Sequence, residues 1–342
     1  EALGPPRSLT YPLEAPGPYR VGHRVMEVTY TPVATGASRT IPLQVWYPTE
    51  DTEGDAVLYL DAFTDEDALG NATLAPSVDG APFPVHIHTH GNLGWGGLAD
   101  HVASRFVSHG WVVVAPDHLG NTLVDNVRDG DVPAWVWPVR VEDVGASLDH
   151  LASLPEADPL SDQLDVDHVL LSGHSYGGAA AFWLSGATLS AARVDTLCGA
   201  NDGCTEAEGD AFALKQPDAR IAAVLSMAPG DSDLFTGVGL NSLSVPLLHM
   251  TDDDDRPEDN AAYWTQAPTG SLRLHMTGAC HTTYTLGGCP GFDTELGLQI
   301  VNTYALAFAR HLLLGDQDPE TLALLDGRRI IDASSELLVK AE

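Results

Sequence analysis

The stretch VLLSGHSYGGAAAFW (residues 169–183) decides the fold. Branched apolar residues lead into Gly173-His174-Ser175-Tyr176-Gly177, and an alanine-rich segment follows, so a strand pattern becomes a helix pattern around one serine. A Gly-x-Ser-x-Gly turn between a strand and a helix holds its serine in an unfavourable backbone conformation, with Oγ exposed at the carboxyl edge of a sheet. The pattern therefore predicts that Ser175 is a nucleophile.

Alternating strand and helix patterns surround this turn. Short apolar runs predict strands at 84–91, 111–117, 167–175, 220–229, 245–251 and 271–278, and amphipathic stretches predict helices at 98–110, 139–154, 177–192 and 294–315. This alternation is typical of an α/β fold with a mostly parallel central sheet and helices on both faces. Within the second helix we expect Arg140, Asp143 and Asp149 to lie off the apolar face.

The flanking segments complete a single predicted domain, residues 1–342. Residues 21–48 predict an N-terminal β-hairpin, and residues 49–81 are acidic and loop-like. The first twenty residues lack the basic start and apolar centre of a signal peptide, so they are interpreted as a Pro-rich arm. Residues 193–217 form an insertion between a helix and the next strand, which favours a small lid. No run of 18 or more apolar residues is present, so no transmembrane helix is predicted.

The charge balance is strongly acidic. Lys and Arg number 16 against 48 Asp and Glu, a formal charge of −32. Such a protein is a poor partner for nucleic acid or anionic membrane surfaces. The acidic residues are scattered, which favours a role in solubility over cation binding.

Four cysteines fall into two local pairs. Cys198 and Cys204, and Cys280 and Cys289, each close a short loop, although four cysteines permit three connectivities. Two stapled loops in a large chain indicate an oxidising compartment, so we expect a secreted or periplasmic protein. A zinc site would favour Cys-x-x-Cys spacing, which neither pair has.

A serine nucleophile needs a histidine base. Downstream of Ser175, His249 and His275 lie inside strand patterns, where a core role is favoured, and His311 belongs to the last helix. His281 follows the strand at 271–278 on a loop beside the Cys280–Cys289 pair. We therefore predict His281 as the base.

The orienting acid should follow the strand at 245–251, where Asp252-Asp253-Asp254-Asp255 stands. A carboxylate several residues beyond the strand has the longer reach, which favours Asp255 and then Asp254. A solvated acidic turn and a calcium-binding loop remain the alternatives for this run.

The oxyanion hole needs two backbone donors. We predict the N–H of Tyr176 and, from HGNLGWGG (90–97), the N–H of Asn92. Trp95 and Trp137 either line the substrate pocket or belong to the core. His86, His88 and His90 alternate along one strand face, but no carboxylate follows at ligand spacing, so we predict no metal site.

With these residues in place, the chain resembles the α/β-hydrolase superfamily. It is most similar to the bacterial branch related to platelet-activating-factor acetylhydrolases and predicted dienelactone hydrolases, through HTHGN (88–92), VVVAPDHLGNT (112–122), GHSYGG (173–178) and GACHTTYT (278–285). The resemblance covers roughly residues 18–310. It implies a serine esterase with Ser175 as nucleophile, His281 as base and the backbone of Asn92 and Tyr176 as oxyanion hole.

Two departures from this family are visible. Asp252 stands where relatives usually carry glycine, and the elbow residue is Ser175 where true dienelactone hydrolases use cysteine. Cutinase-like polyester hydrolases share the triad order and often carry a disulfide near the histidine.

The sequence thus predicts a secreted, monomeric serine carboxylester hydrolase without a cofactor. Short-chain esters come first as substrates, lipid-like esters second and aromatic polyesters third. An amidase or peptidase on the same triad is the alternative chemistry. A non-enzymatic binding protein would be expected to lack a triad member, yet all three residue types are present in order.

Overall fold

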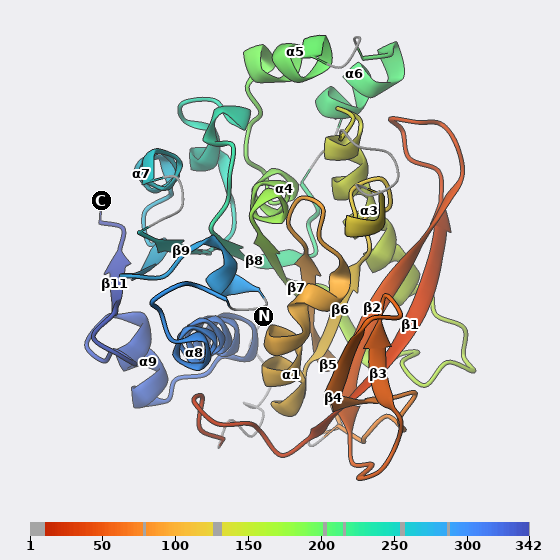
Figure 1. Cartoon of the computed structure of the whole chain (residues 1–342), viewed down its shortest axis with the longest axis vertical. Coiled ribbons are helices and arrows are strands. Elements are labelled where there is room, and N and C mark those ends of the chain that lie inside the picture. The colour runs from red at the N-terminus through yellow and green to blue at the C-terminus, as the bar shows by residue number, and fades with distance from the viewer. Residues whose placement is uncertain are drawn as a thin grey trace.

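The computed structural model describes residues 11–77, 80–125, 132–200, 204–214, 217–253, 257–285 and 288–341. One sheet runs through this part of the molecule, with helices on both of its faces (Figure 1). Its strand order is β11-β10-β9-β8-β7-β5-β6-β2-β1-β4-β3.

The centre of the sheet is parallel and its edges contain antiparallel pairs. β6, β5, β7, β8, β9 and β10 are parallel neighbours, whereas β1 with β2, β2 with β6, β3 with β4 and β10 with β11 are antiparallel. The predicted mostly parallel sheet and N-terminal hairpin are therefore present. The strands are β1 (Arg20–Tyr30), β2 (Arg39–Thr49), β3 (Ala56–Tyr59), β4 (Phe63–Gly70), β5 (Phe83–Thr89), β6 (Val112–Pro116), β7 (Leu164–His174), β8 (Ile221–Met227), β9 (Leu247–Asp252), β10 (Leu272–Met276) and β11 (Ser335–Val339).

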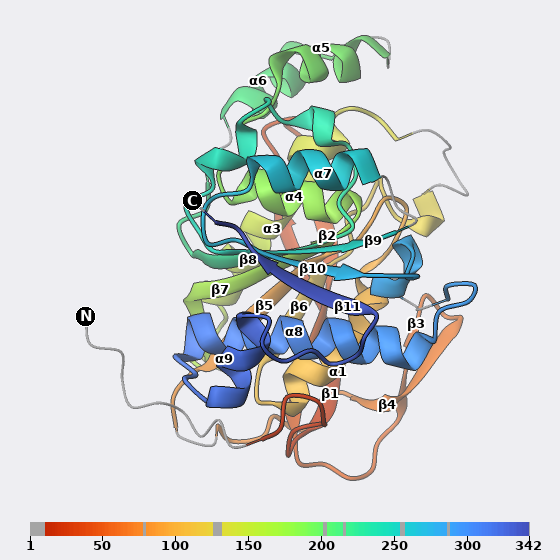
Figure 2. The ribbon, with the colours of Figure 1, turned by 90° about the vertical axis from the view of Figure 1, so that its left-hand side faces the viewer.

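Two hydrophobic cores cover the two faces of the sheet. One contains apolar side chains of α1 (Asp100–Ser108), α8 (Thr294–Leu314) and α9 (Pro319–Leu325). The other contains those of α3 (Val136–Ala152), α4 (Tyr176–Leu184) and α7 (Pro257–Gln266). Figure 2 shows the two sets of helices on opposite sides of the strands. Because both faces are covered, the central strands β5, β6 and β9 are buried along their whole length.

The prediction of a loop over residues 49–81 is wrong, because β3 and β4 lie within it. Burial alternates along β3, where Val57 and Tyr59 point inward between exposed neighbours. The Tyr59 hydroxyl accepts a hydrogen bond from Nε1 of Trp46 at 2.8 Å. The surrounding acidic residues concealed this short amphipathic hairpin.

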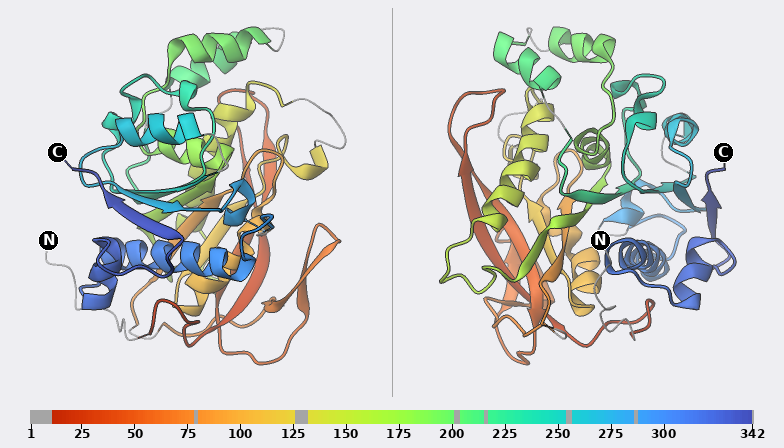
Figure 3. Two further views of the ribbon diagram at one scale, coloured as in Figure 1. Left: turned by 60° about the vertical axis from the view of Figure 1, so that its left-hand side comes forward. Right: turned by 180° about the vertical axis from the view of Figure 1, so that it is seen from behind.

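The helix predicted at 177–192 is shorter than expected. α4 ends at Leu184, and Gly186 has φ 108°, a left-handed conformation that stops the helix. The following insertion forms α5 (Ala191–Ala200) and α6 (Glu206–Leu214), joined by the disulfide between Cys198 and Cys204. Both helices extend beyond α4, away from the sheet (Figure 3).

The placement of Arg140 and Asp143 outside the core is also wrong. Their exposed fractions are 1% and 0%. α3 packs one face against the sheet; Arg140 is covered by the loops that follow β5 and β6, and Asp143 by the loop after β6 and by Tyr30 of β1. Asp143 accepts hydrogen bonds from Tyr30 (2.5 Å) and pairs with His118 (2.8 Å), which compensates for burial of its carboxyl.

No helix in the described ranges is both long and apolar enough to cross a membrane.

Candidate active site

Ser175 occupies the turn between β7 and α4. Its backbone has φ 55° and ψ −120°, a conformation that non-glycine residues rarely adopt. The Ser175 N–H donates to the carbonyl of Met227 at 2.9 Å, which holds the turn against the neighbouring strand β8. The serine predicted as nucleophile therefore has the strained backbone that a nucleophile elbow requires.

The glycines of the elbow allow α4 to lie close to the sheet. A Cβ atom at Gly173 would overlap the carbonyl oxygen of Gly177. A Cβ atom at Gly177 would overlap the carbonyl oxygen of Thr89 and approach that of His90 to 2.7 Å. The start of α4 is thus packed directly against the end of β5.

Gly177→Ala should therefore disrupt the elbow. Because the alanine Cβ would clash with main-chain atoms of Thr89 and His90, α4 would have to shift, and we expect a loss of about 3 kcal/mol in the free energy of unfolding. Urea unfolding measures this loss. Gly209→Ala in α6 is the control, since its Cβ would meet nothing within 4 Å, and stability there should be unchanged or rise by up to about 1 kcal/mol. Equal stability of the two variants would contradict the close packing.

A cavity of about 530 Å³ opens beside Ser175. Asn92 and Tyr176, the residues predicted to form the oxyanion hole, line it together with the serine. Trp137 also lines it and stacks on the Tyr176 ring, with ring centroids 3.5 Å apart. The structure therefore brings three of the predicted site residues to one cavity.

The insertion supplies part of the cavity wall, through Arg193 and Leu197 of α5. Arg193 binds Asp231 through two hydrogen bonds, of 3.1 Å from Nε and 2.8 Å from Nη2. Asp233 and Asp259 lie on the same wall. Among the described residues that line the cavity, carboxylates therefore outnumber guanidinium groups.

Trp95 does not lie among the described residues that line this cavity. It is 6% exposed and stacks on Phe63 of β4, with ring centroids 5.1 Å apart. Of the two interpretations of this tryptophan, packing is the one that the structure supports.

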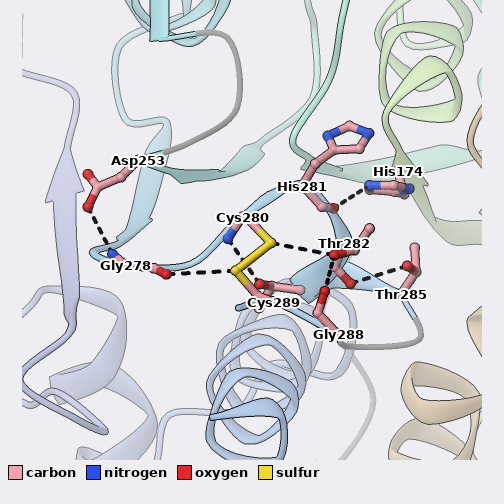
Figure 4. The surroundings of a disulfide bond; sticks show 10 residues. His174, Asp253, Gly278, Cys280, His281, Thr282, Thr285, Gly288 and Cys289 are labelled. Carbon is pink, nitrogen blue, oxygen red and sulfur yellow. Dashed lines mark hydrogen bonds between the residues drawn. A yellow bond between two sulfur atoms is a disulfide. The ribbon is translucent and has the colours of Figure 1, made fainter. Parts of the chain in front are cut away.

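His281 begins a short 3-10 turn after β10, and its main chain is tied to the elbow. Its carbonyl accepts a hydrogen bond from Nε2 of His174 at 2.9 Å, and the two rings lie 4.5 Å apart between centroids (Figure 4). His174 immediately precedes Ser175. Burial, together with the nearby His281, holds the pKa of His174 well below its usual value, so His174 is a neutral donor.

The disulfide between Cys280 and Cys289 pairs the two cysteines that the sequence places around this loop. It closes the loop directly beside His281 (Figure 4). The main chain of this loop is further fixed by the hydrogen bond from the Thr282 hydroxyl to the Gly288 carbonyl at 2.5 Å. The predicted base therefore stands on a constrained segment.

The predicted acid, Asp255, and its alternative, Asp254, lie outside the described residues. Asp253 accepts a hydrogen bond from the Gly278 N–H (2.8 Å) and pairs with Nε2 of His275 (3.0 Å). Its side chain points toward Gly278, with the disulfide between it and His281 in the view of Figure 4. Asp253 therefore stabilises the end of β10 rather than orienting His281. The assignment of Asp255 as the acid stays a prediction.

The other histidines downstream of Ser175 have structural surroundings. His249 is fully buried, with the rings of Phe182 and Tyr263 nearby. His275 binds Asp253, and Nδ1 of His311 lies 2.8 Å from the carbonyl of Asp316. His281 as the base stays a prediction.

His86 and His88 of β5, and His90 directly after it, are buried and hydrogen-bonded. His86 and His88 bind the hydroxyl of Ser172, at 2.6 and 2.8 Å, and Nε2 of His90 accepts from the N–H of His118 at 3.2 Å. Among the residues that the structure describes, no group of three or more His, Cys, Asp or Glu side chains is placed to hold a metal ion. Nε2 of His86, Nδ1 of His88 and both ring nitrogens of His90 take part in hydrogen bonds within the core.

Comparisons with known proteins give a likeness of fold. No protein-family model and no curated protein sequence matches the chain. Among solved structures, a ferulic acid esterase from Streptomyces cinnamoneus is similar with a TM-score of 0.65 and 19% sequence identity, over 95% of this chain and 98% of that one. The sheet order, the helices on both faces and this likeness fit the α/β-hydrolase fold. The chain thus shares its fold, over nearly its whole length, with an esterase.

Proposed function

We propose that the protein is a serine carboxylester hydrolase. The observation that carries the proposal is the strained backbone of Ser175 at a strand-to-helix turn, beside a cavity that Asn92 and Tyr176 also line. The fold shared with a ferulic acid esterase supports the same chemistry. The two disulfides support secretion or a periplasmic location.

The proposed reaction passes through an acyl-enzyme. Oγ of Ser175 attacks the ester carbonyl carbon while His281 accepts the hydroxyl proton, and Asp255 orients the imidazolium. The tetrahedral oxyanion accepts hydrogen bonds from the N–H groups of Asn92 and Tyr176. When the C–O bond breaks, the alcohol leaves with the proton from His281. Water, deprotonated by His281, then attacks the acyl-enzyme. As the bond to Oγ of Ser175 breaks, His281 returns the proton to Oγ and the acid is released, so the cycle requires no cofactor.

The cavity suggests the substrate class. A volume of about 530 Å³ is suited to a compact ligand, and the apolar side chains of Ala134, Trp137 and Leu197 line it. This wall would accommodate a short acyl chain or a single aromatic ring. We therefore propose esters of short-chain or single-ring acids as substrates, ahead of lipid-like esters and aromatic polyesters.

Hydrolysis of matched substrates, combined with active-site labelling, tests the proposal. We expect p-nitrophenyl acetate and butyrate and methyl ferulate to be cleaved faster than p-nitrophenyl octanoate, and acetyl p-nitroanilide to be cleaved far more slowly than the acetate. A fluorophosphonate should abolish hydrolysis, and peptide mass spectrometry should find it on Ser175. Faster anilide cleavage would indicate an amidase. Hydrolysis that continues after complete labelling, or a label elsewhere, would contradict the assignment of Ser175.

A further inference from the structure

Arg140 is a charged side chain buried beneath the candidate active site. It stands near the start of α3 and is 1% exposed. Burial lowers its pKa to about 10, so the guanidinium remains charged at neutral pH. No carboxylate in the described ranges pairs with it. Because a buried charge is unfavourable unless hydrogen bonds compensate for it, the groups that surround Arg140 indicate its role.

Most of these groups belong to the end of β5 and the loop after it. Nη2 donates to the Thr89 hydroxyl at 3.0 Å and makes a short hydrogen bond to the His90 carbonyl. Nη1 donates to the Gly91 carbonyl at 3.4 Å. The same carbonyl oxygen accepts a hydrogen bond from the Gly94 N–H at 3.1 Å and lies 2.7 Å from Nδ1 of His90. One guanidinium therefore contacts three successive residues immediately before Asn92.

These contacts bear on the direction of the Asn92 N–H. The Gly91 carbonyl and the Asn92 N–H belong to one planar trans peptide unit, so they point in opposite directions. Because the Gly91 carbonyl faces Arg140, the Asn92 N–H faces away from it. The guanidinium thus fixes the orientation of the donor that the proposed mechanism requires.

The same guanidinium also acts on the side chain of Asn92 and on Tyr176. Nη1 donates to Oδ1 of Asn121 at 2.5 Å, and Nδ2 of Asn121 donates to Oδ1 of Asn92 at 2.7 Å. The guanidinium carbon lies 5.0 Å from the centre of the Tyr176 ring. Arg140 therefore contacts or supports both residues of the candidate oxyanion hole, which come from different parts of the chain.

We infer that Arg140 is a positioning residue of the oxyanion hole. It orients the peptide that carries the Asn92 N–H, fixes the Asn92 side chain through Asn121, and holds the Tyr176 ring. Its positive charge also favours the oxyanion that develops nearby. This inference rests on the proposed esterase function, because the hole matters only if an oxyanion forms.

Arg140→Lys is the decisive variant, because lysine keeps the charge but cannot reach the loop and Asn121 together. With p-nitrophenyl acetate we expect kcat to fall by about 10²- to 10³-fold, the effect of losing one oxyanion donor, while KM changes less than about threefold. Affinity for a trifluoromethyl ketone, which forms a tetrahedral adduct, should fall by a similar factor. Affinity for the product acid should not change.

Arg310→Lys is the matched control. Arg310 is 4% exposed and pairs with Asp316 at 3.0 Å, but it stands on α8, on the other face of the sheet. Its loss should lower the melting temperature and leave kcat within about threefold of the wild type. This variant separates the general effect of replacing a buried arginine from an effect on the hole.

Asn121→Ala keeps the inference testable should Arg140→Lys fail to fold. It removes the link to the Asn92 side chain, and we expect kcat to fall at least tenfold with KM unchanged. If Arg140→Lys folds and keeps the wild-type kcat, the inference is overturned. If Arg140→Lys does not fold, a wild-type kcat in Asn121→Ala overturns it. A wild-type protein that neither hydrolyses esters nor labels at Ser175 would instead reject the proposed function.

Discussion

Replacing Ser175 with alanine should lower kcat/KM for p-nitrophenyl acetate by about 10⁶-fold, the scale on which removal of a catalytic serine acts. Alanine lacks the hydroxyl that forms the acyl-enzyme, and fluorophosphonate labelling should be lost with it. The fold should persist, since alanine and serine face the same left-handed strain at φ 55° and differ by one buried oxygen. Initial rates, with the melting temperature recorded in parallel, measure both effects.

Ser226→Ala is the control for this substitution. Ser226 is fully buried in β8, and a Cβ atom on Gly178, in the first turn of α4, would come within 2.9 Å of its hydroxyl. That hydroxyl makes no hydrogen bond to the described part of the chain. We expect kcat/KM within about threefold of the wild type. More than about one per cent of the activity remaining in Ser175→Ala would sink the assignment of the nucleophile.

Acid should destabilise the fold well before its surface carboxylates titrate. We expect the free energy of unfolding to fall by several kcal/mol between pH 6 and pH 5. The cause is a set of buried and partly buried histidines whose pKa values lie below the usual 6.5, chiefly because burial disfavours their charged form: His23 (about 4), His86 (about 3), His88, His90, His101 (about 4), His109 (about 4), His118, His150, His174 and His249 (about 3).

The sign follows from the protons that each state binds. Below pH 6.5 these ten histidines take up protons more readily in the unfolded chain than in the folded one, so their contribution is present above 6.5 and is lost as the pH falls. Asp100, Asp117 and Asp143 act oppositely, because burial raises their pKa values, for Asp100 to about 6 and for Asp143 to about 7. The histidines outnumber these carboxyls ten to three, so unfolding takes up protons on balance, and each net proton is equivalent to about 1.4 kcal/mol per pH unit.

Urea unfolding followed by tryptophan fluorescence at pH 8, 7, 6 and 5 measures this slope. His249→Phe should reduce it by about one proton, or about 1.4 kcal/mol per pH unit, since an aromatic ring at this fully buried site would remain beside Phe182 and Tyr263. His168→Gln is the control, because that side chain is 72% exposed. A stability that does not change between pH 8 and pH 5 would contradict neutral buried histidines.

The sequence was sufficient for those parts of the molecule in which local pattern and burial agree. The continuous apolar runs of β5, β6 and β9 identified central strands, because only a sheet covered on both faces buries every position. The Gly-x-Ser-x-Gly pattern identified the strand-to-helix turn at Ser175, because both the serine conformation and the close approach of α4 require that spacing.

Predictions from the sequence were wrong where a side chain has its partners in distant segments of the chain. Arg140 and Asp143 interrupt an amphipathic helix and are therefore predicted to be exposed, yet both are buried against segments that lie 49 to 113 residues away in the sequence. The hairpin of β3 and β4 was hidden by its acidic, outward-facing residues. Hydrophobic periodicity does not report such polar contacts, and an arginine fixed by backbone carbonyls has no local signal.

The polar wall of the cavity also bears on how a catalytic cycle would end. Hydrolysis converts a neutral ester into a carboxylate, and the described lining residues include Asp231, Asp233 and Asp259 against one guanidinium, that of Arg193, which Asp231 already neutralises. An anionic product would therefore be repelled as soon as it forms. In the reaction proposed here, this repulsion favours departure of the acid into solvent, so the product should inhibit the enzyme only weakly. Because added salt screens the field of the carboxylates, product inhibition should become stronger as the salt concentration rises.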